Sequence, residues 1–201
     1  MRYYVYMKKK YCILILISLF SIIFFRVAFA DDFQDGLYSL QAKDYGSAYK
    51  LLYPLAKQGN ALAQLFVATM YEKGQSVPLN KKEAAKWYRL SAEQGNAEGQ
   101  VNLGRMYAQG HGVPEDDKEA GKWFRLSAEQ GNARAQGTLG ARFERGVGVQ
   151  KDYVSAHMWY NLAASNGNTM AEIVRYKLEE KMTPQQITQA QDMARNWKSK
   201  K

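Results

Sequence analysis

The two histidines are the first candidates for catalysis or metal binding. His111 lies in a short glycine-flanked segment, Gly110-His111-Gly112. His157 lies near Trp159, at a position that is lysine in two related segments of the chain, so we expect an outward side chain. Neither histidine has neighbours at the spacing of a metal site or of a nucleophile–base pair. We therefore expect neither to bind a metal or to catalyse a reaction.

The densest acidic group is Glu115-Asp116-Asp117, which could offer cation binding. Its spacing is not that of an EF-hand loop. Acidic residues are favoured in the first turn of a helix, and Asp116 is placed to cap one. The Gly-x-Gly segments at 110–112 and 146–148 lack the preceding strand and the following Lys-Ser/Thr of a phosphate loop. With no Ser/His/Asp set either, the sequence predicts a protein that is not an enzyme and has no metal or cofactor.

Residues 1–30 have the three parts of a secretory signal: a basic start, an apolar run over 11–25, and Ala28-Phe29-Ala30. This order predicts cleavage before Asp31 and export to a periplasm or out of the cell. The alternative is an uncleaved anchor that tethers an envelope scaffold to the membrane. The apolar run is shorter than the roughly 20 residues that a membrane span needs, so we favour cleavage.

Removal of residues 1–30 changes what the composition implies. The only cysteine, Cys12, lies in this segment, so residues 31–201 can form no disulfide and offer no thiol chemistry. The segment also carries five of the 28 basic side chains and none of the 19 acidic ones, which leaves 23 basic against 19 acidic. This modest excess gives little support to nucleic-acid binding. Oligomeric state is left open.

A 36-residue period organises the rest of the chain. Gly59, Gly95, Gly131 and Gly167 follow one another at this interval, and the first three lie in identical Gln-Gly-Asn triplets. Within each period, similar residues recur at steps of three and four, which is typical of one face of an α-helix. A fixed period of this length predicts a solenoid, in which each unit buries its apolar face against the next.

Each period predicts two antiparallel helices. Gly74, Gly110 and Gly146 end the first helix, and Asn80, Asp116 and Asp152 cap the start of the second. Small residues at the Ala68 position let the aromatic residues of the second helix approach. At the C-terminus, Thr183-Pro184-Gln185-Gln186 predicts a capping box that starts a final helix. We expect about ten helices in five antiparallel pairs.

The repeated pattern A-x-A-Q-x-x-L-G-x-x-Y-x-x-G-x-G-V-x-x-D-x-x-x-A-x-x-W-Y resembles the Sel1-like repeat, a relative of the tetratricopeptide repeat. The resemblance implies an all-α, right-handed superhelical solenoid. It gives these divisions: a signal peptide at 1–30, an N-terminal partial or capping repeat at 31–58, full repeats at 59–94, 95–130 and 131–166, and C-terminal capping helices at 167–201.

The resemblance also implies a function. Sel1-like proteins are generally adaptors, so we expect a protein or peptide partner held in the concave groove. The alternative is the β-lactam binding or hydrolysis suggested for cysteine-rich Sel1-like proteins, which the lack of cysteine in residues 31–201 argues against.

The positions that break the repeat are the candidate binding residues. On the first helix of each pair, several columns vary freely and cluster opposite the packing face, since helical residues are about 100° apart. They change from apolar to basic along the chain, which predicts an acidic segment in the partner. The candidate partner-binding residues are Leu62, Phe66, Thr69, Lys73, Glu98, Asn102, Arg105, Gln109, Arg134, Thr138, Arg142 and Arg145.

Overall fold

The structure is a computed structural model that describes residues 32–197. The predicted signal segment lies outside the described residues. Within them, residues 32–41 are helical and no strand is present. The helices that follow are α2 (Tyr45–Lys57), α3 (Ala61–Lys73), α4 (Lys81–Glu93), α5 (Ala97–Gln109), α6 (Asp117–Glu129), α7 (Ala133–Arg145), α8 (Tyr153–Ser165), α9 (Thr169–Glu179) and α10 (Pro184–Arg195).

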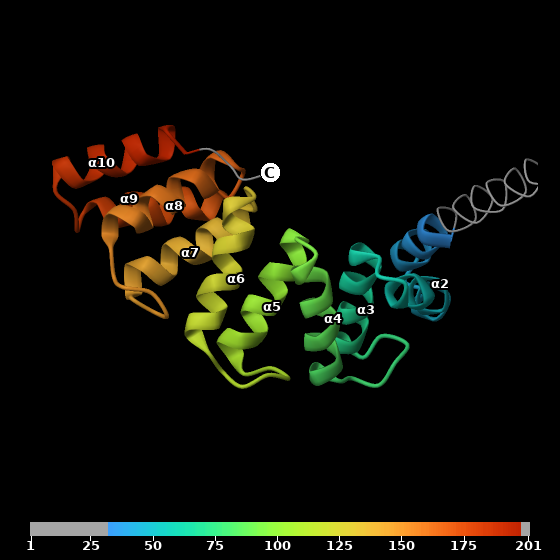
Figure 1. The fold of residues 1–201 in the computed structure, drawn as a ribbon. Helices are drawn as coiled ribbons and strands as arrows, with labels where there is room; N and C mark the ends of the chain where they lie inside the picture. Colours follow the sequence, from blue (N-terminus) through green and yellow to red (C-terminus); the bar gives the residue numbers. More distant parts are fainter. Residues whose placement is uncertain (1–31, 198–201) are drawn as a thin grey trace, which may run out of the picture.

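From α2 to α9, consecutive helices pack side by side along the chain (Figure 1). Within the repeated part, α3 packs on α4, α5 on α6 and α7 on α8, while α4 contacts α5 and α6 contacts α7 across the junctions between units. Apolar side chains fill both kinds of interface, so the core runs the length of the array. The predicted all-α solenoid of helix pairs is confirmed. No helix in the described part of the chain is long and apolar enough to cross a membrane.

The Gln-Gly-Asn triplet makes the turn between units. Gly95 has a φ of 86°, in the left-handed region that glycine adopts without strain. The side chain of Asn96 then caps α5 by accepting a hydrogen bond of 2.7 Å from Gly99 N. On the other side of the turn, Gln94 Nε2 donates to Gln64 Oε1 at 2.7 Å. The triplet therefore supplies the end of one helix, the turn and the start of the next.

A chain of buried glutamines connects successive units. Gln100 donates from Nε2 to the carbonyl oxygen of Ala92 in the preceding unit at 3.2 Å, and its Oε1 accepts from Gln130 Nε2 at 2.8 Å. Gln64 and Gln136 make the equivalent contacts. Because a buried amide must be paired, these bonds specify the register of one unit on the next.

The predicted helix ends and small residues are confirmed. Gly146 ends α7 in the left-handed conformation at φ 75°, as Gly74 and Gly110 do in α3 and α5. Gly140 lies against the ring of Tyr160, where an added Cβ would come within 2.8 Å of Cδ1. A small residue on the first helix is thus what allows the aromatic ring of the second helix to reach the core.

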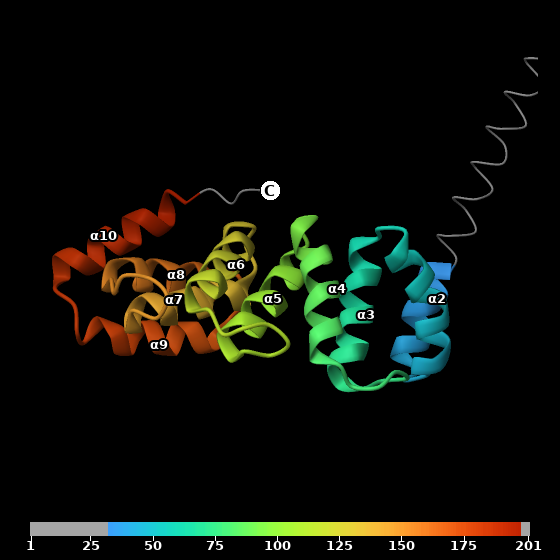
Figure 2. The same ribbon diagram turned by 60° about the horizontal axis from the view of Figure 1, so that its bottom comes forward.

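The last two helices do not form the expected fifth pair. α10 begins with the predicted capping box, but it packs on α8 instead of on α9. Figure 2 shows α9 and α10 on opposite sides of α8. The rings of Trp159 and Trp197 meet edge to face with centroids 4.8 Å apart, and Ala190 and Ala194 are buried. Small residues on α10 and an aromatic contact close this end of the core.

The expected outward orientation of His157 is wrong. Its side chain is fully buried, and its Nε2 lies 2.8 Å from Glu179 Oε1 at the end of α9. The repeat placed it with Lys86 and Lys122, which are exposed. Those lysines lie on α4 and α6, each of which packs against two helices, whereas α8 packs against three. His157 is joined to α9 through Glu179, whereas Lys86 and Lys122 pair with Glu83 and Glu119 on their own helices.

Candidate binding groove

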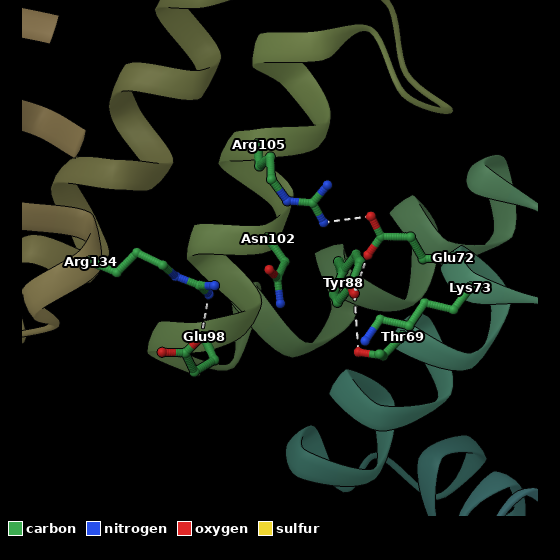
Figure 3. Close-up of a pocket in the computed structure, with 8 residues that line it drawn as sticks. All are labelled: Thr69, Glu72, Lys73, Tyr88, Glu98, Asn102, Arg105 and Arg134. Carbon is green, nitrogen blue, oxygen red and sulfur yellow. Dashed lines mark hydrogen bonds and ion pairs between the residues drawn. The ribbon is translucent and has the colours of Figure 1, made fainter. Parts of the chain in front are cut away.

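Two adjoining pockets lie over the first helices of the units. The first has a volume of about 490 Å³ and draws its walls from α3, α4, α5 and α7 (Figure 3). The second, of about 350 Å³, lies over α7, α8 and α9. Arg134 lines both pockets, so we call the continuous surface the groove. The first pocket is lined by Thr69, Glu72, Lys73, Tyr88, Glu98, Asn102, Arg105 and Arg134.

A half-buried glutamate organises the first pocket. Glu72 Oε2 accepts a hydrogen bond from the Tyr88 hydroxyl at 2.7 Å, and Glu72 Oε1 lies 2.6 Å from Arg105 NH2. The hydroxyl of Tyr88 also contacts Thr69 Oγ1 at 3.1 Å, and these contacts are visible in Figure 3. The arrangement joins α3, α4 and α5 through one carboxylate.

Burial and hydrogen bonding shift the pKa of Glu72 in opposite directions, and their balance sets the charge of this cluster. Burial by itself would raise the pKa of Glu72, but the hydrogen bonds from Tyr88 and Arg105, with the charges of Arg105 and Lys73, bring it below the ordinary value of 4.5. Burial, assisted by the Glu72 carboxylate, raises the pKa of the Tyr88 hydroxyl. Glu72 is therefore ionised and Tyr88 protonated at neutral pH.

The outer part of the first pocket offers hydrogen-bond donors. Arg134 forms a salt bridge with Glu98, which also accepts from Asn132 Nδ2 at 2.6 Å. The side-chain amide of Asn102 has no hydrogen-bond partner among the described residues, and Lys73 forms no salt bridge with any of them. Asn102 and Lys73 are therefore available to a ligand.

The second pocket repeats the central arrangement of the first. Glu144 accepts from the Tyr160 hydroxyl at 3.0 Å and from Lys181 Nζ at 3.0 Å. Burial and the Glu144 carboxylate raise the pKa of the Tyr160 hydroxyl. Arg145 lines the rim, and Met170, with other residues of α9, adds an apolar wall.

Eight of the twelve residues predicted to bind a partner line the groove. Gln109 adjoins it, at 3.4 Å from Arg105 NH1. Leu62 is exposed, and Phe66 packs in part against the core formed with α2, so neither lines a pocket. The eight residues in the pockets are Thr69, Lys73, Glu98, Asn102, Arg105, Arg134, Thr138 and Arg145.

Arg142 does not lie in the groove, contrary to the sequence interpretation. It is 8% exposed, and its NH2 donates to the carbonyl oxygen and to the carboxylate of Asp117 at 2.8 and 2.6 Å. Its guanidinium also lies over the Phe124 ring at 5.6 Å. The repeat contained the signal for this, since the equivalent positions are Met70 and Met106, both fully buried. Arg142 packs between units.

Ten residues that line the two pockets escaped the sequence interpretation. Four of them, Glu72, Tyr88, Glu144 and Tyr160, form the two hydrogen-bonded glutamate–tyrosine pairs. The tyrosines were assigned to the core only, and the glutamates were not considered. The available signal was that both glutamates and both tyrosines are 72 residues apart, which is two periods. In the described part of the chain, no group of three or more His, Cys, Asp or Glu side chains could hold a metal ion.

Four consecutive segments match the family model of the Sel1 repeat, at residues 30–60, 61–96, 97–132 and 133–168. The chain belongs to the Sel1 repeat family. The matched segments include the N-terminal unit, which the sequence suggested to be partial. Sel1 repeat proteins are commonly protein-interaction scaffolds. No curated protein matches this chain.

Solved structures of Sel1 repeat proteins resemble this one. A Sel1 repeat protein from Oxalobacter formigenes is 38% identical, with a TM-score of 0.67, over 70% of this chain and 56% of that one. The protective antigen c5321 of uropathogenic Escherichia coli strains, described as displaying an SLR fold, is 28% identical, with a TM-score of 0.60, over 84% of this chain and 45% of that one. The present chain thus spans about half the length of each.

Proposed function

We propose that this Sel1 repeat protein is a non-enzymatic scaffold that binds a peptide or protein partner in the groove. The observation that carries the proposal is the pair of adjoining pockets, lined by residues of six helices: α3, α4, α5, α7, α8 and α9. Regular stacking of units creates extended surfaces of this kind, which suit an elongated ligand.

The charges of the groove favour an acidic segment in the partner. The two pockets are lined by four cationic side chains against three carboxylates: Lys73, Arg105, Arg134 and Arg145 against Glu72, Glu98 and Glu144. All three carboxylates accept hydrogen bonds within the protein, and Arg105 and Arg134 pair with Glu72 and Glu98. Lys73 and Arg145 form no salt bridge with a described residue, so they supply the excess positive charge. An acidic segment would gain attraction during the approach and specificity once bound.

Photo-crosslinking in the native cell tests the binding surface. A photoreactive amino acid at Asn102 or Thr138, both in the groove, should capture a partner that mass spectrometry can identify. The matched control is Leu90, a side chain that is 43% exposed and lies outside both pockets. Capture at Leu90 with none at Asn102 or Thr138 would place the binding surface elsewhere.

Charge reversal tests the acidic partner. Lys73→Glu combined with Arg145→Glu should weaken capture, because both side chains are exposed on the groove rim. Replacement of two exposed cations outside both pockets, Lys50→Glu with Lys86→Glu, is the control for net charge. Equal loss with both pairs would show that the effect is one of overall charge.

We also propose that the protein is exported and then cleaved, on the basis of residues 1–30. The N-terminal sequence of the protein from expressing cells should begin at Asp31, whereas an uncleaved membrane anchor predicts Met1 in the membrane fraction. The proposal that the protein is not an enzyme is open to a direct assay, since turnover of a chromogenic β-lactam by the purified protein would contradict it.

A further inference from the structure

The two pockets contain the same three kinds of side chain at equivalent positions. Each has a glutamate at the end of the first helix, a cation directly after it, and a tyrosine on the second helix that donates to the glutamate. We call each set a station. The first station is Glu72, Lys73 and Tyr88, and the second is Glu144, Arg145 and Tyr160, each member 72 residues after its counterpart.

The glutamate of each station is neutralised by another cation of the protein. Arg105, from the next unit, pairs with Glu72, and Lys181, from the segment after α9, pairs with Glu144. The cation of the station is then in excess. Lys73 and Arg145 are both exposed, and neither forms a salt bridge with a described residue. Each station therefore presents one positive charge to a ligand.

The unit between the stations lacks all three groups. Its equivalent positions hold Ala108, Gln109 and Phe124, which carry no charge and no hydroxyl. The backbone of the solenoid repeats every 36 residues, but the excess charge on its binding face repeats every 72. Two separate anchoring points follow from this alternation, with a neutral stretch between them.

We propose that the groove binds one extended segment of a partner through two acidic side chains, one at each station. The inference rests on the proposed function and specifies its ligand. Side chains of successive first helices meet directly, Glu72 of α3 with Arg105 of α5 and Glu98 of α5 with Arg134 of α7. Successive first helices are therefore about one helix diameter, or about 10 Å, apart, and the stations are about 20 Å apart. An extended chain advances about 3.3 Å per residue, so the two acidic side chains lie about six residues apart.

The second station also predicts which kind of ligand residue lies next to the acidic side chain that the station binds. The wall of its pocket includes Met170, Ala171 and Val174, with Met170 64% exposed. The wall of the first station is polar, with Asn102 and Glu98. An apolar residue beside one of the two acidic residues of the ligand would gain buried area only at the second station. We therefore expect the ligand to bind in one orientation along the groove, with its apolar residue at the second station.

Synthetic peptides test this spacing directly. Fluorescein-labelled Gly/Ser peptides would carry two Asp-Glu pairs with centres about three, six or nine residues apart, one pair followed by leucine. Fluorescence anisotropy at low ionic strength should show the tightest binding at the middle spacing. Lys73→Gln and Arg145→Gln should each weaken that binding about threefold, as expected for exposed charge pairs. Lys50→Gln, which removes an exposed cation outside both pockets, is the matched control and should leave it unchanged.

A gain-of-function variant makes the test sharper. Gln109→Lys places a cation midway between the stations and should improve binding of the shortest spacing relative to the middle one. Equal affinity for all three spacings, no binding of any of the peptides, or a loss at Lys73 without a loss at Arg145 would each overturn the two-station inference. The crosslinks at Asn102 and Thr138 test separately whether the groove binds a partner at all. Failure of the two-station inference can therefore be distinguished from failure of the proposed function.

Discussion

The Tyr88 hydroxyl donates a 2.7 Å hydrogen bond to Glu72 Oε2, joining the two helices of one unit. The same bond joins Tyr160 to Glu144 two units later, and the unit between them has Phe124 and Ala108 at these positions. The pair sits where the helix interface meets the groove, so it contributes both to packing and to the charge of the binding surface.

Tyr88→Phe should lower the free energy of unfolding by about 1.5–3 kcal/mol, because a hydrogen bond to a charged and partly buried group is lost. Urea denaturation of the purified protein measures the difference. Tyr176→Phe is the matched control, since this side chain is 55% exposed and exposed substitutions change stability by about 0.5 kcal/mol or less. Equal effects of the two variants would mean that the Glu72 contact contributes nothing.

Acidification should remove the contribution of Glu72 to stability. Burial raises the pKa of Glu72, but the donors Tyr88 and Arg105 outweigh it and hold the folded-state pKa below 4.5. The unfolded chain then binds more protons than the folded one, so the stabilisation is present above pH 4.5 and is lost as the pH falls through the folded-state pKa. The stability gap between the wild type and Glu72→Gln should narrow from neutral pH to about pH 3.

Arg105→Gln provides the control for this pH dependence. It removes the cation that pairs with Glu72 at 2.6 Å, so the folded-state pKa of Glu72 should rise. The stability gap between Arg105→Gln and the double variant Arg105→Gln, Glu72→Gln should therefore begin to narrow at a higher pH than the gap between the wild type and Glu72→Gln. A gap between wild type and Glu72→Gln that is constant with pH would contradict the assigned charge state of Glu72.

Arg142→Met should leave stability within about 1 kcal/mol of the wild type, because the side chain of Asp117 is 42% exposed and remains solvated when its partner is removed. Methionine occupies the equivalent buried positions 70 and 106. Arg142→Ala should lower stability by about 2–3 kcal/mol through the cavity that it leaves. Both are measured by urea denaturation. Reduced partner capture by the stable Arg142→Met variant would show that Arg142 does contribute to partner binding.

Trp197→Ala should destabilise the C-terminal end by about 3 kcal/mol, because it removes the aromatic side chain that holds α10 on α8. Thermal unfolding measures the loss, and greater hydrogen exchange of α10 should accompany it. Met193→Ala, on a side chain that is 38% exposed, should change stability by less than about 1 kcal/mol. Unchanged exchange in α10 after Trp197→Ala would show that other contacts hold it.

The sequence predicted the units because their signals are local. Asn96 caps a helix three residues away, and Gly146 ends one through its own backbone conformation. Steps of three and four residues identify a helical face without knowledge of any other helix. The same reasoning placed eight of the twelve predicted residues in the groove, since columns that do not pack are free to face solvent.

The repeat failed where one unit meets something other than a copy of its neighbour. His157 was assigned from Lys86 and Lys122, but α8 packs against three helices instead of two. The packing of α10 on α8 was equally unpredicted, because no earlier unit has a helix in that place. End units lack the neighbour that the period assumes, so the periodic pattern does not specify their contacts.

By itself, the sequence determined the period, the helix boundaries and the solenoid class, all of which follow from interactions within about one helical turn or one unit. Only the tertiary structure decided that Glu72 meets Arg105, 33 positions away, and that Arg142 turns toward Asp117. Those contacts depend on how one unit is rotated on the next. Rotation is the summed result of many weak side-chain contacts, and no single motif encodes it.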